Sequence, residues 1–137
     1  MKRYLLDTNH LSEAIGRVSV VRDRIQQQYR QGFTFGTCGP CLCKLLVGVV
    51  SRKDEAKTRR RLDGLLQVVR VWPIDLDIAD HYSRIYFELR NAGRAMSQVD
   101  IMLAAMARQM NAALLTTDLD FRALPDILTE NWVNPGS

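Results

Sequence analysis

The sequence predicts an α/β fold in which a mostly parallel sheet lies between two layers of helices, as three observations indicate. Short β-type runs alternate along the chain with longer segments of helical periodicity. The 137 residues, of which 47% are hydrophobic and 25% charged, suit one globular domain of ordinary composition. The sequence contains no internal repeat, low-complexity tract or Gly/Ser/Pro linker. We therefore expect a single three-layer α/β/α domain over residues 1–137.

The first half of the chain predicts strands and helices in alternation. Residues 2–6 are a short β-type run, after which apolar residues in the range 11–25 recur at helical spacing until Gly32 stops the helix. Residues 33–37 alternate as a second strand. Pro40 then suits the first turn of a further helix. The core stripe of that helix is expected to comprise Leu42, Leu45, Leu46 and Val49.

The second half continues the same alternation. Leucines lie on one side of a charged segment, a β-branched run follows it, and two long segments of helical periodicity come next. Gly93 lies where the first of these two long helices should end. Helices are expected over residues 54–67, 75–91 and 97–111, and strands over residues 68–72, 113–116 and, as a short final strand, near Trp132.

Three aspartates stand where this fold would bring them together. Asp7 follows the first strand, Asp118 follows a later strand, and Asp100 opens an alanine-rich helix. The carboxyl ends of parallel strands meet at one edge of a sheet, where ligands bind in such folds. Each acid also has a structural explanation, because Asp7 could cap a helix, Asp100 belongs to a segment that resembles a capping box, and Asp118 could be a loop acid.

Taken together, the three acids favour a cation site. Several carboxylates within a few ångströms of one another are unfavourable unless a cation compensates them or one keeps its proton. Mg²⁺ and Mn²⁺ prefer such oxygen ligands, often with waters and a substrate phosphate in the same shell. An ion of this kind can activate water and stabilise the displacement at a phosphodiester.

A second candidate site is the pair Cys38 and Cys41, which stands in the letters TCGPC. A Cys-x-x-Cys motif after a strand and at a helix start is typical of dithiol redox proteins. However, no tryptophan precedes Cys38, and the chain lacks the expected strand beginning with a cis-proline opposite it. We expect reduced cysteines that act as small apolar residues, and keep the dithiol redox protein as an alternative.

Charge and hydropathy bear on the partners of the protein and on its location in the cell. The formal net charge of +4 suits a polyanionic partner, although this alone is weak support. The apolar runs are far shorter than the ~20 residues that span a bilayer, and Asp7 follows too soon for a signal-peptide core. We therefore expect a cytoplasmic protein without membrane contact. His10 and His81 have no partner at metal-ligand spacing and are expected to be structural or surface residues.

Four segments in order resemble a known family. They read LLDTNHLSE at residues 5–13, LLVGV at 45–49, SQVDIMLAAMA at 97–107 and LLTTDLDF at 114–121. With this arrangement the chain resembles a PIN-domain ribonuclease of the VapC toxin type, over nearly its whole length. Each segment alone is weakly specific, but their combination is fairly specific.

The resemblance implies a compact α/β/α domain that cuts RNA with Mg²⁺ or Mn²⁺, is neutralised by a cognate antitoxin protein, and forms a homodimer. It implies that Asp7, Asp100 and Asp118 are catalytic metal ligands, and that Asp120 could add a looser contact or serve a second ion. By the same resemblance, Asn9 and Thr116 would orient these ligands or the phosphate through hydrogen bonds.

One position differs from the family pattern, which places a glutamate in the helix motif E-L-L-x-G. This chain has Lys44 there, in the letters KLLVG. An ammonium would repel the metal and could pair with the aspartates instead. We expect Lys44 to share a narrow face of small residues with Cys41 and Gly48 and so to reach a tight site.

Several interpretations of Lys44 stay open. It could mark a natural variant with altered metal binding, an inactivated toxin or a substitution acquired in cloning, or its side chain could simply extend into solvent. The corresponding alternative function is a catalytically inactive PIN-like binding module.

Overall fold

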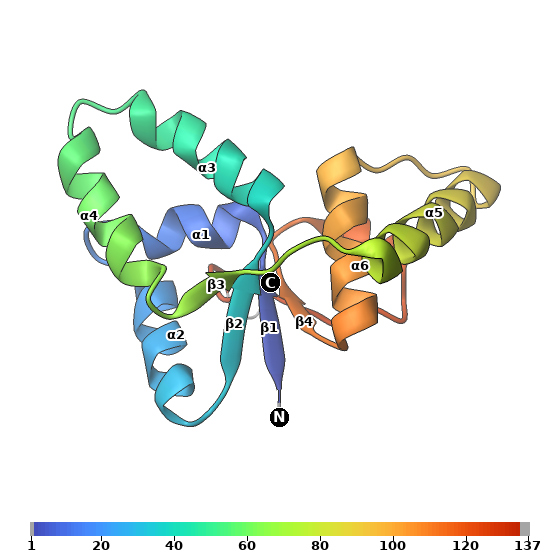
Figure 1. The fold of residues 1–137 in the computed structure, drawn as a ribbon, viewed down its shortest axis with the longest axis horizontal. Coiled ribbons are helices and arrows are strands. Elements are labelled where there is room, and N and C mark those ends of the chain that lie inside the picture. Colours follow the sequence, from blue (N-terminus) through green and yellow to red (C-terminus); the bar gives the residue numbers. More distant parts are fainter. Residues whose placement is uncertain (1, 135–137) are drawn as a thin grey trace.

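The computed structural model describes residues 2–134, which form a five-stranded sheet covered by helices on both faces (Figure 1). All strand pairs are parallel, and the strand order is β3-β2-β1-β4-β5. The expected α/β/α architecture is therefore confirmed. In chain order the elements are β1 (Arg3–Leu6), α1 (Thr8–Ala14), α2 (Val20–Arg30), β2 (Thr34–Thr37), α3 (Gly39–Val50), α4 (Glu55–Leu65), β3 (Val69–Val71), α5 (Leu76–Asn91), α6 (Gln98–Met110), β4 (Ala113–Leu115), the 3₁₀ helix η1 (Leu119–Ala123) and β5 (Thr129–Glu130).

The path of the chain makes β1 the centre of the sheet. From β1 the strands proceed outward to β2 and β3, with α1 to α4 on one face. The chain then returns through α5 and α6 on the other face to β4, which pairs with β1 on its free side (Figure 1). The direction of winding therefore reverses next to β1. The carboxyl ends of β1 and β4 border the crevice where such folds bind ligands.

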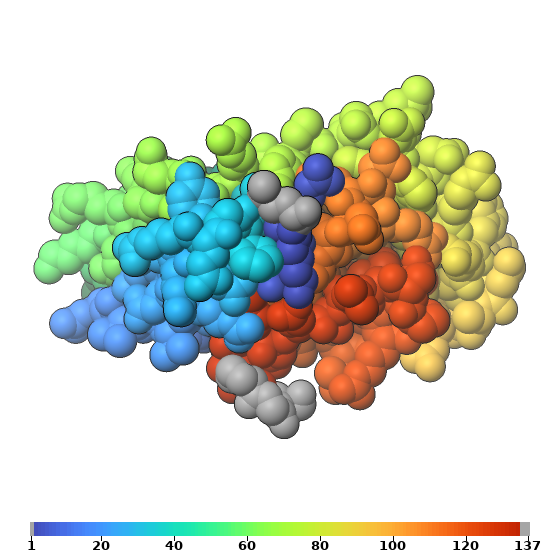
Figure 2. Space-filling view, turned by 90° about the horizontal axis from the view of Figure 1, so that it is seen from below, coloured from blue at the N-terminus to red at the C-terminus, as the bar shows by residue number. Residues whose placement is uncertain are grey.

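Burial explains why the central strands read as continuous apolar runs. Leu5, Leu6, Leu114 and Leu115 are fully buried, as expected for strands that have helices on both sides. Tyr4 stacks on Phe35 of the neighbouring strand and meets Trp132 edge-on, with ring centroids 5.2 and 4.9 Å apart. The C-terminal segment, red in Figure 2, lies between the blue N-terminal elements and the orange and yellow helices α5 and α6.

Helix ends follow the sequence signals. Pro40 lies in the first turn of α3, and Ser97 caps α6 by accepting a hydrogen bond from the Asp100 backbone N–H at 3.2 Å. At the other end of α6, Asn111 adopts the left-handed conformation with φ of 52°. No helix within residues 2–134 has both the length and the apolar character needed to cross a membrane.

The short final strand expected near Trp132 is present as Thr129–Glu130, and the Trp132 side chain that follows it is buried in the core. One expectation needs correction. In α3, the fully packed positions are Cys41, Leu45 and Val49, whereas Leu42 and Leu46 are only partly buried. The helical period was right, but its buried face is rotated toward the cysteine, whose small thiol fits the tight space beside the sheet.

A close contact between β2 and the residue after β3 gives a stability test. A Cβ atom added to Gly36 would overlap the indole ring of Trp72. We expect Gly36→Ala to lower the free energy of unfolding by about 1–3 kcal/mol, because the ring must be displaced. Urea denaturation measures the change.

Gly48→Ala is the matched control, since a Cβ there meets no atom within 4 Å. Alanine on this exposed turn of α3 should be neutral or stabilise by up to about 1 kcal/mol. Equal stability of the two variants would contradict the proposed overlap at Gly36.

Candidate functional site

Asp7 is the buried acid of the site, and its carboxylate is fixed from two sides. It follows β1 directly and is only 5% exposed. Its Oδ1 accepts a hydrogen bond from the Thr8 backbone N–H at 2.7 Å, so Asp7 caps α1. Its Oδ2 accepts one from the Thr116 hydroxyl at 2.8 Å. These bonds offset the cost of burying a charged group.

Thr116 connects Asp7 to the second acid. The Thr116 hydroxyl oxygen accepts the Asp118 backbone N–H at 3.0 Å while donating to Asp7. Asp118 is half-buried and caps η1, where its Oδ1 accepts the Asp120 backbone N–H at 2.9 Å. Asp120 is itself exposed. The structure thus places Asp7, Thr116 and Asp118 in one hydrogen-bonded chain, with Asp120 at its outer end.

Asp100 is the third predicted acid, and it lies at the start of α6, the helix that precedes β4. It is half-buried in the first turn of α6. Burial raises the pKa of its carboxyl, and the negative charges of Asp7 and Asp118 raise it further, whereas a hydrogen bond with Ser97 and the positive charge of Lys44 lower it. The charges of Asp7, Asp118 and Lys44 therefore all act on Asp100.

The chemistry of the three acids suits a divalent cation, but their side chains are not close enough together to hold one. Carboxylates are the ligand type that Mg²⁺ and Mn²⁺ prefer, and the pKa of Asp100 is raised mainly by burial and, to a smaller extent, by the charges of Asp7 and Asp118. Within residues 2–134, however, no group of three or more His, Cys, Asp or Glu side chains is gathered closely enough to hold a metal ion. An ion would have to draw these side chains closer.

Lys44 lies on the exposed side of α3. Cys41, one turn earlier, is fully buried, whereas Gly48 is exposed like Lys44. The expected narrow face shared by Cys41 and Lys44 is therefore wrong, because their positions on the helix fall on either side of the boundary between core and solvent. The charge of Lys44 nevertheless acts on Asp100.

The two cysteines of the Cys-x-x-Cys motif are buried next to each other. The Sγ atoms of Cys38 and Cys41 are 3.4 Å apart, and both residues are free thiols without solvent exposure. The hydrogen bond between them lowers the pKa of Cys38, and that bond together with burial raises the pKa of Cys41. Because both thiols lie beneath the surface, a protein disulfide could not reach them without local opening, in keeping with a packing role.

His10 is a residue of the site region whose connections the sequence did not reveal. It is fully buried, and this burial lowers its pKa to about 4. Its Nε2 accepts the Trp132 backbone N–H at 2.9 Å, so its proton must sit on Nδ1, which lies 2.9 Å from the Asn9 Oδ1. Neutral His10 thus joins Asn9 to the C-terminal segment. His81, in contrast, is a surface residue that contacts Gln109.

Comparison with known protein families gives a match over most of the chain. The profile of the PIN domain family matches residues 4–127. "Ribonuclease VapC2" of Rickettsia felis is 25% identical over 130 residues, covering 94% of this chain and 97% of the relative. "Ribonuclease VapC1" of Haemophilus influenzae strain R2866 is 25% identical over 134 residues, covering 94% and 97%.

Solved structures show the same fold. In the complex described as VapBC2 from Rickettsia felis bound to a DNA fragment from their promoter, one chain superposes with a TM-score of 0.83 at 24% identity, covering 95% of this chain and 98% of the other. DNA-bound VapBC from Salmonella typhimurium gives a TM-score of 0.81 at 23% identity, covering 96% and 99%. At these identities the likeness concerns the fold alone.

The buried His10 predicts a pH dependence of stability. Its folded-state pKa of about 4 lies below the ordinary histidine value of 6.5, so folding favours the neutral form. This contribution is fully present above pH 6.5 and is lost as the pH falls toward 4, by up to about 3 kcal/mol. We expect thermal or urea unfolding of His10→Gln to lose most of that pH dependence.

His81→Gln is the control, because it removes an exposed histidine from the same protein. It should keep the loss of stability between pH 6.5 and 4 that the parent chain shows. If His10→Gln and the parent chain lost stability in parallel over this interval, another group would be responsible.

Proposed function

This chain belongs to the PIN domain family, and we propose that it is an endoribonuclease that hydrolyses RNA phosphodiester bonds with Mg²⁺ or Mn²⁺ at Asp7, Asp100 and Asp118. The observation that carries the proposal is the hydrogen-bonded chain of Asp7, Thr116 and Asp118 at the carboxyl ends of β1 and β4. The charges of Asp7 and Asp118 also act on Asp100 at the start of α6. The curated relatives are named ribonucleases, which supports the choice of RNA as substrate.

Each acid has a distinct role in this proposal. Asp7 is held in one orientation by Thr8 and Thr116, so it would be the fixed ligand toward which the other acids move. Asp118 and Asp100 would complete the ligand set from β4 and α6. A bound ion would supply the positive charge that activates water and stabilises the phosphodiester during displacement. Asp120 could add an outer contact.

Hydrogen bonds around the acids would keep them in place. Thr116 ties Asp7 to the backbone of Asp118, so any shift of one acid is transmitted to the other. Asn9 is oriented by His10 through its Oδ1, which leaves its amide nitrogen as the donor for an acid or a phosphate. Thr116 and Asn9 would therefore both help to hold the acids or a bound phosphate in position.

In this proposal, Lys44 limits the affinity of the site for a divalent cation. Its ammonium lowers the pKa of Asp100, so it already supplies part of the compensation that a divalent ion would give. A cation must therefore bind against this charge, which weakens its affinity. The same observation favours the second candidate function, a catalytically inactive PIN-like module in which Lys44 replaces the metal.

The proposal extends to partners and location. Known structures of this fold include VapBC complexes and a "toxin-antitoxin complex from Klebsiella pneumoniae", and we infer a cognate antitoxin and a homodimer for this chain as well. A cytoplasmic location agrees with a toxin that acts on cellular RNA.

Cleavage of RNA by three proteins tests the proposal. With Mn²⁺ or Mg²⁺ present, we expect Asp100→Asn to abolish cleavage, because it removes a ligand charge. We expect Lys44→Glu to raise the rate at limiting metal about tenfold or more, because it changes the local charge by two units close to the ion. Gel analysis of labelled RNA measures both effects.

Lys53→Glu makes the same charge change on an exposed turn outside the site and should leave the rate unchanged. Cleavage that survives Asp100→Asn would remove the proposed site. If neither the parent chain nor Lys44→Glu cuts RNA, the binding module becomes the better account.

A further inference from the structure

A polar cavity of about 380 Å³ opens beside the acids, at the carboxyl ends of β4 and β5. Thr116 forms part of its wall, and the hydroxyl of this residue also bonds to Asp7, so the cavity adjoins the proposed metal site directly. Its size falls within the range of small-molecule sites. Its further lining includes Thr117, Asp118, Arg122, Thr129, Glu130 and Asn131.

The charges of this cavity favour an anionic ligand. Glu130 is already compensated, because its carboxylate accepts hydrogen bonds from the Lys2 Nζ at 3.0 Å and the Trp132 Nε1 at 3.1 Å. Asp118 would be neutralised by a bound metal ion in the proposed function. Arg122 is exposed at this cavity, and its guanidinium is the cation of the lining. A phosphate suits such a group geometrically.

Neutral groups around Arg122 suit a base or ribose. Thr117 and Thr129 contribute hydroxyls to the lining. The Asn131 Oδ1 accepts the backbone N–H groups of Val133 and Asn134 at 3.0 and 2.9 Å, which leaves the Asn131 amide nitrogen as a donor for a ligand. A cation together with hydroxyl and amide groups is the combination that binds a nucleotide.

The walls of the cavity are held in place by the core. Phe121 of η1 is 1% exposed, and Trp132, which follows β5, is fixed by its backbone hydrogen bond to His10. Little ordering is therefore needed when a ligand enters, which lowers the cost of binding.

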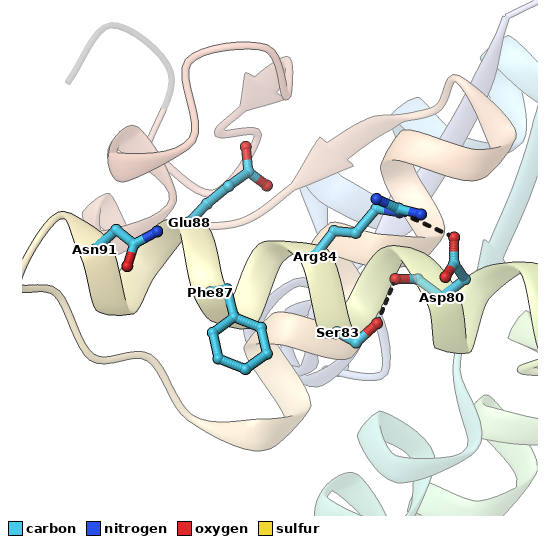
Figure 3. A pocket seen from close by; sticks show the side chains of 6 residues that line it. All are labelled: Asp80, Ser83, Arg84, Phe87, Glu88 and Asn91. Atoms are coloured by element: carbon cyan, nitrogen blue, oxygen red, sulfur yellow. Dashed lines mark hydrogen bonds and ion pairs between the residues drawn. The ribbon is translucent and has the colours of Figure 1, made fainter.

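A larger hollow of about 520 Å³ on the described surface has no comparable unpaired cation in its lining. It runs along α5, and its charged side chains already have partners, as Figure 3 shows for Arg84 and Asp80 at 3.0 Å. Glu88 pairs with Arg108 at 2.7 Å. All of its lining residues come from this single helix, and none of them is one of the three acids (Figure 3).

We propose that the cavity lined by Thr117, Arg122 and Asn131 binds the RNA nucleotide adjacent to the scissile phosphodiester, with Arg122 pairing with its phosphate. This inference rests on the proposed ribonuclease function and adds the residues that position the substrate. A nucleotide in the cavity would place the next phosphate of the strand at Asp118 and Asp7.

RNA binding without cleavage tests the inference. A fluorescein-labelled single-stranded oligoribonucleotide is titrated, with Mg²⁺ present, against Asp100→Asn and against Asp100→Asn combined with Arg122→Gln, and anisotropy gives Kd. We expect Arg122→Gln to weaken binding about tenfold. It should also reduce the slope of log K against log salt by about 0.7, the loss of one phosphate contact on a single strand.

Thr117→Val in the same background removes one hydroxyl and keeps the side-chain volume, and we expect about fivefold weaker binding without a change in salt slope. Arg84→Gln is the matched control, because its side chain is 69% exposed on α5. It should change neither quantity.

If Arg122→Gln and Thr117→Val bind as tightly as Arg84→Gln, while the chain still binds and cuts RNA, the cavity does not hold a nucleotide and only this inference fails. If no variant binds RNA and the parent chain does not cut it, the inference and the proposed function fail together.

Discussion

The Thr116 hydroxyl, which donates to Asp7 and accepts from the backbone of Asp118, is the contact on which the candidate site depends. Its bond to Asp7 joins residues 109 positions apart in the sequence, at the place where β1 and β4 end side by side. A carboxylate as buried as Asp7 is unfavourable without such partners. The parallel pairing of β1 with β4 brings the partners together, so the sheet topology and the chemistry of the site have one origin.

The balance of charge around these acids governs what the site can do. Burial and two neighbouring carboxylates raise the pKa of Asp100, and Lys44 opposes them from the exposed side of α3. Under the proposed function, a divalent ion and the lysine would compete to compensate the same negative charge. The proposed nuclease and the alternative binding module would then differ by which cation prevails, while the scaffold is common to both.

Sequence patterns predicted the parts of the structure that depend on local periodicity and on parallel-sheet topology. The long helices were predictable because their caps and apolar spacing are local. Strand direction placed Asp7 and Asp118 at the same edge of the sheet, where Thr116 links them. The bounds of the two-residue strand β5 could only be given as near Trp132, because so short an element has no period and exists only through its pairing with β4. The exposed position of Lys44 could not be predicted, since it depends on how α3 rotates against the sheet.

Contacts between distant segments were beyond the reach of sequence reasoning. The bond from the Trp132 backbone to His10 joins residues 122 positions apart, and no sequence pattern relates the two residues. The cavity at Arg122 likewise arises from η1 and β5 folding beside each other.

Metal affinity is the property that tests the proposed site most directly. Calorimetric titration of Mn²⁺ should give a saturable submillimolar site in Lys44→Glu, a weaker one in the parent chain and none in Asp100→Asn. Equal Mn²⁺ binding by all three proteins would contradict a metal site at these acids.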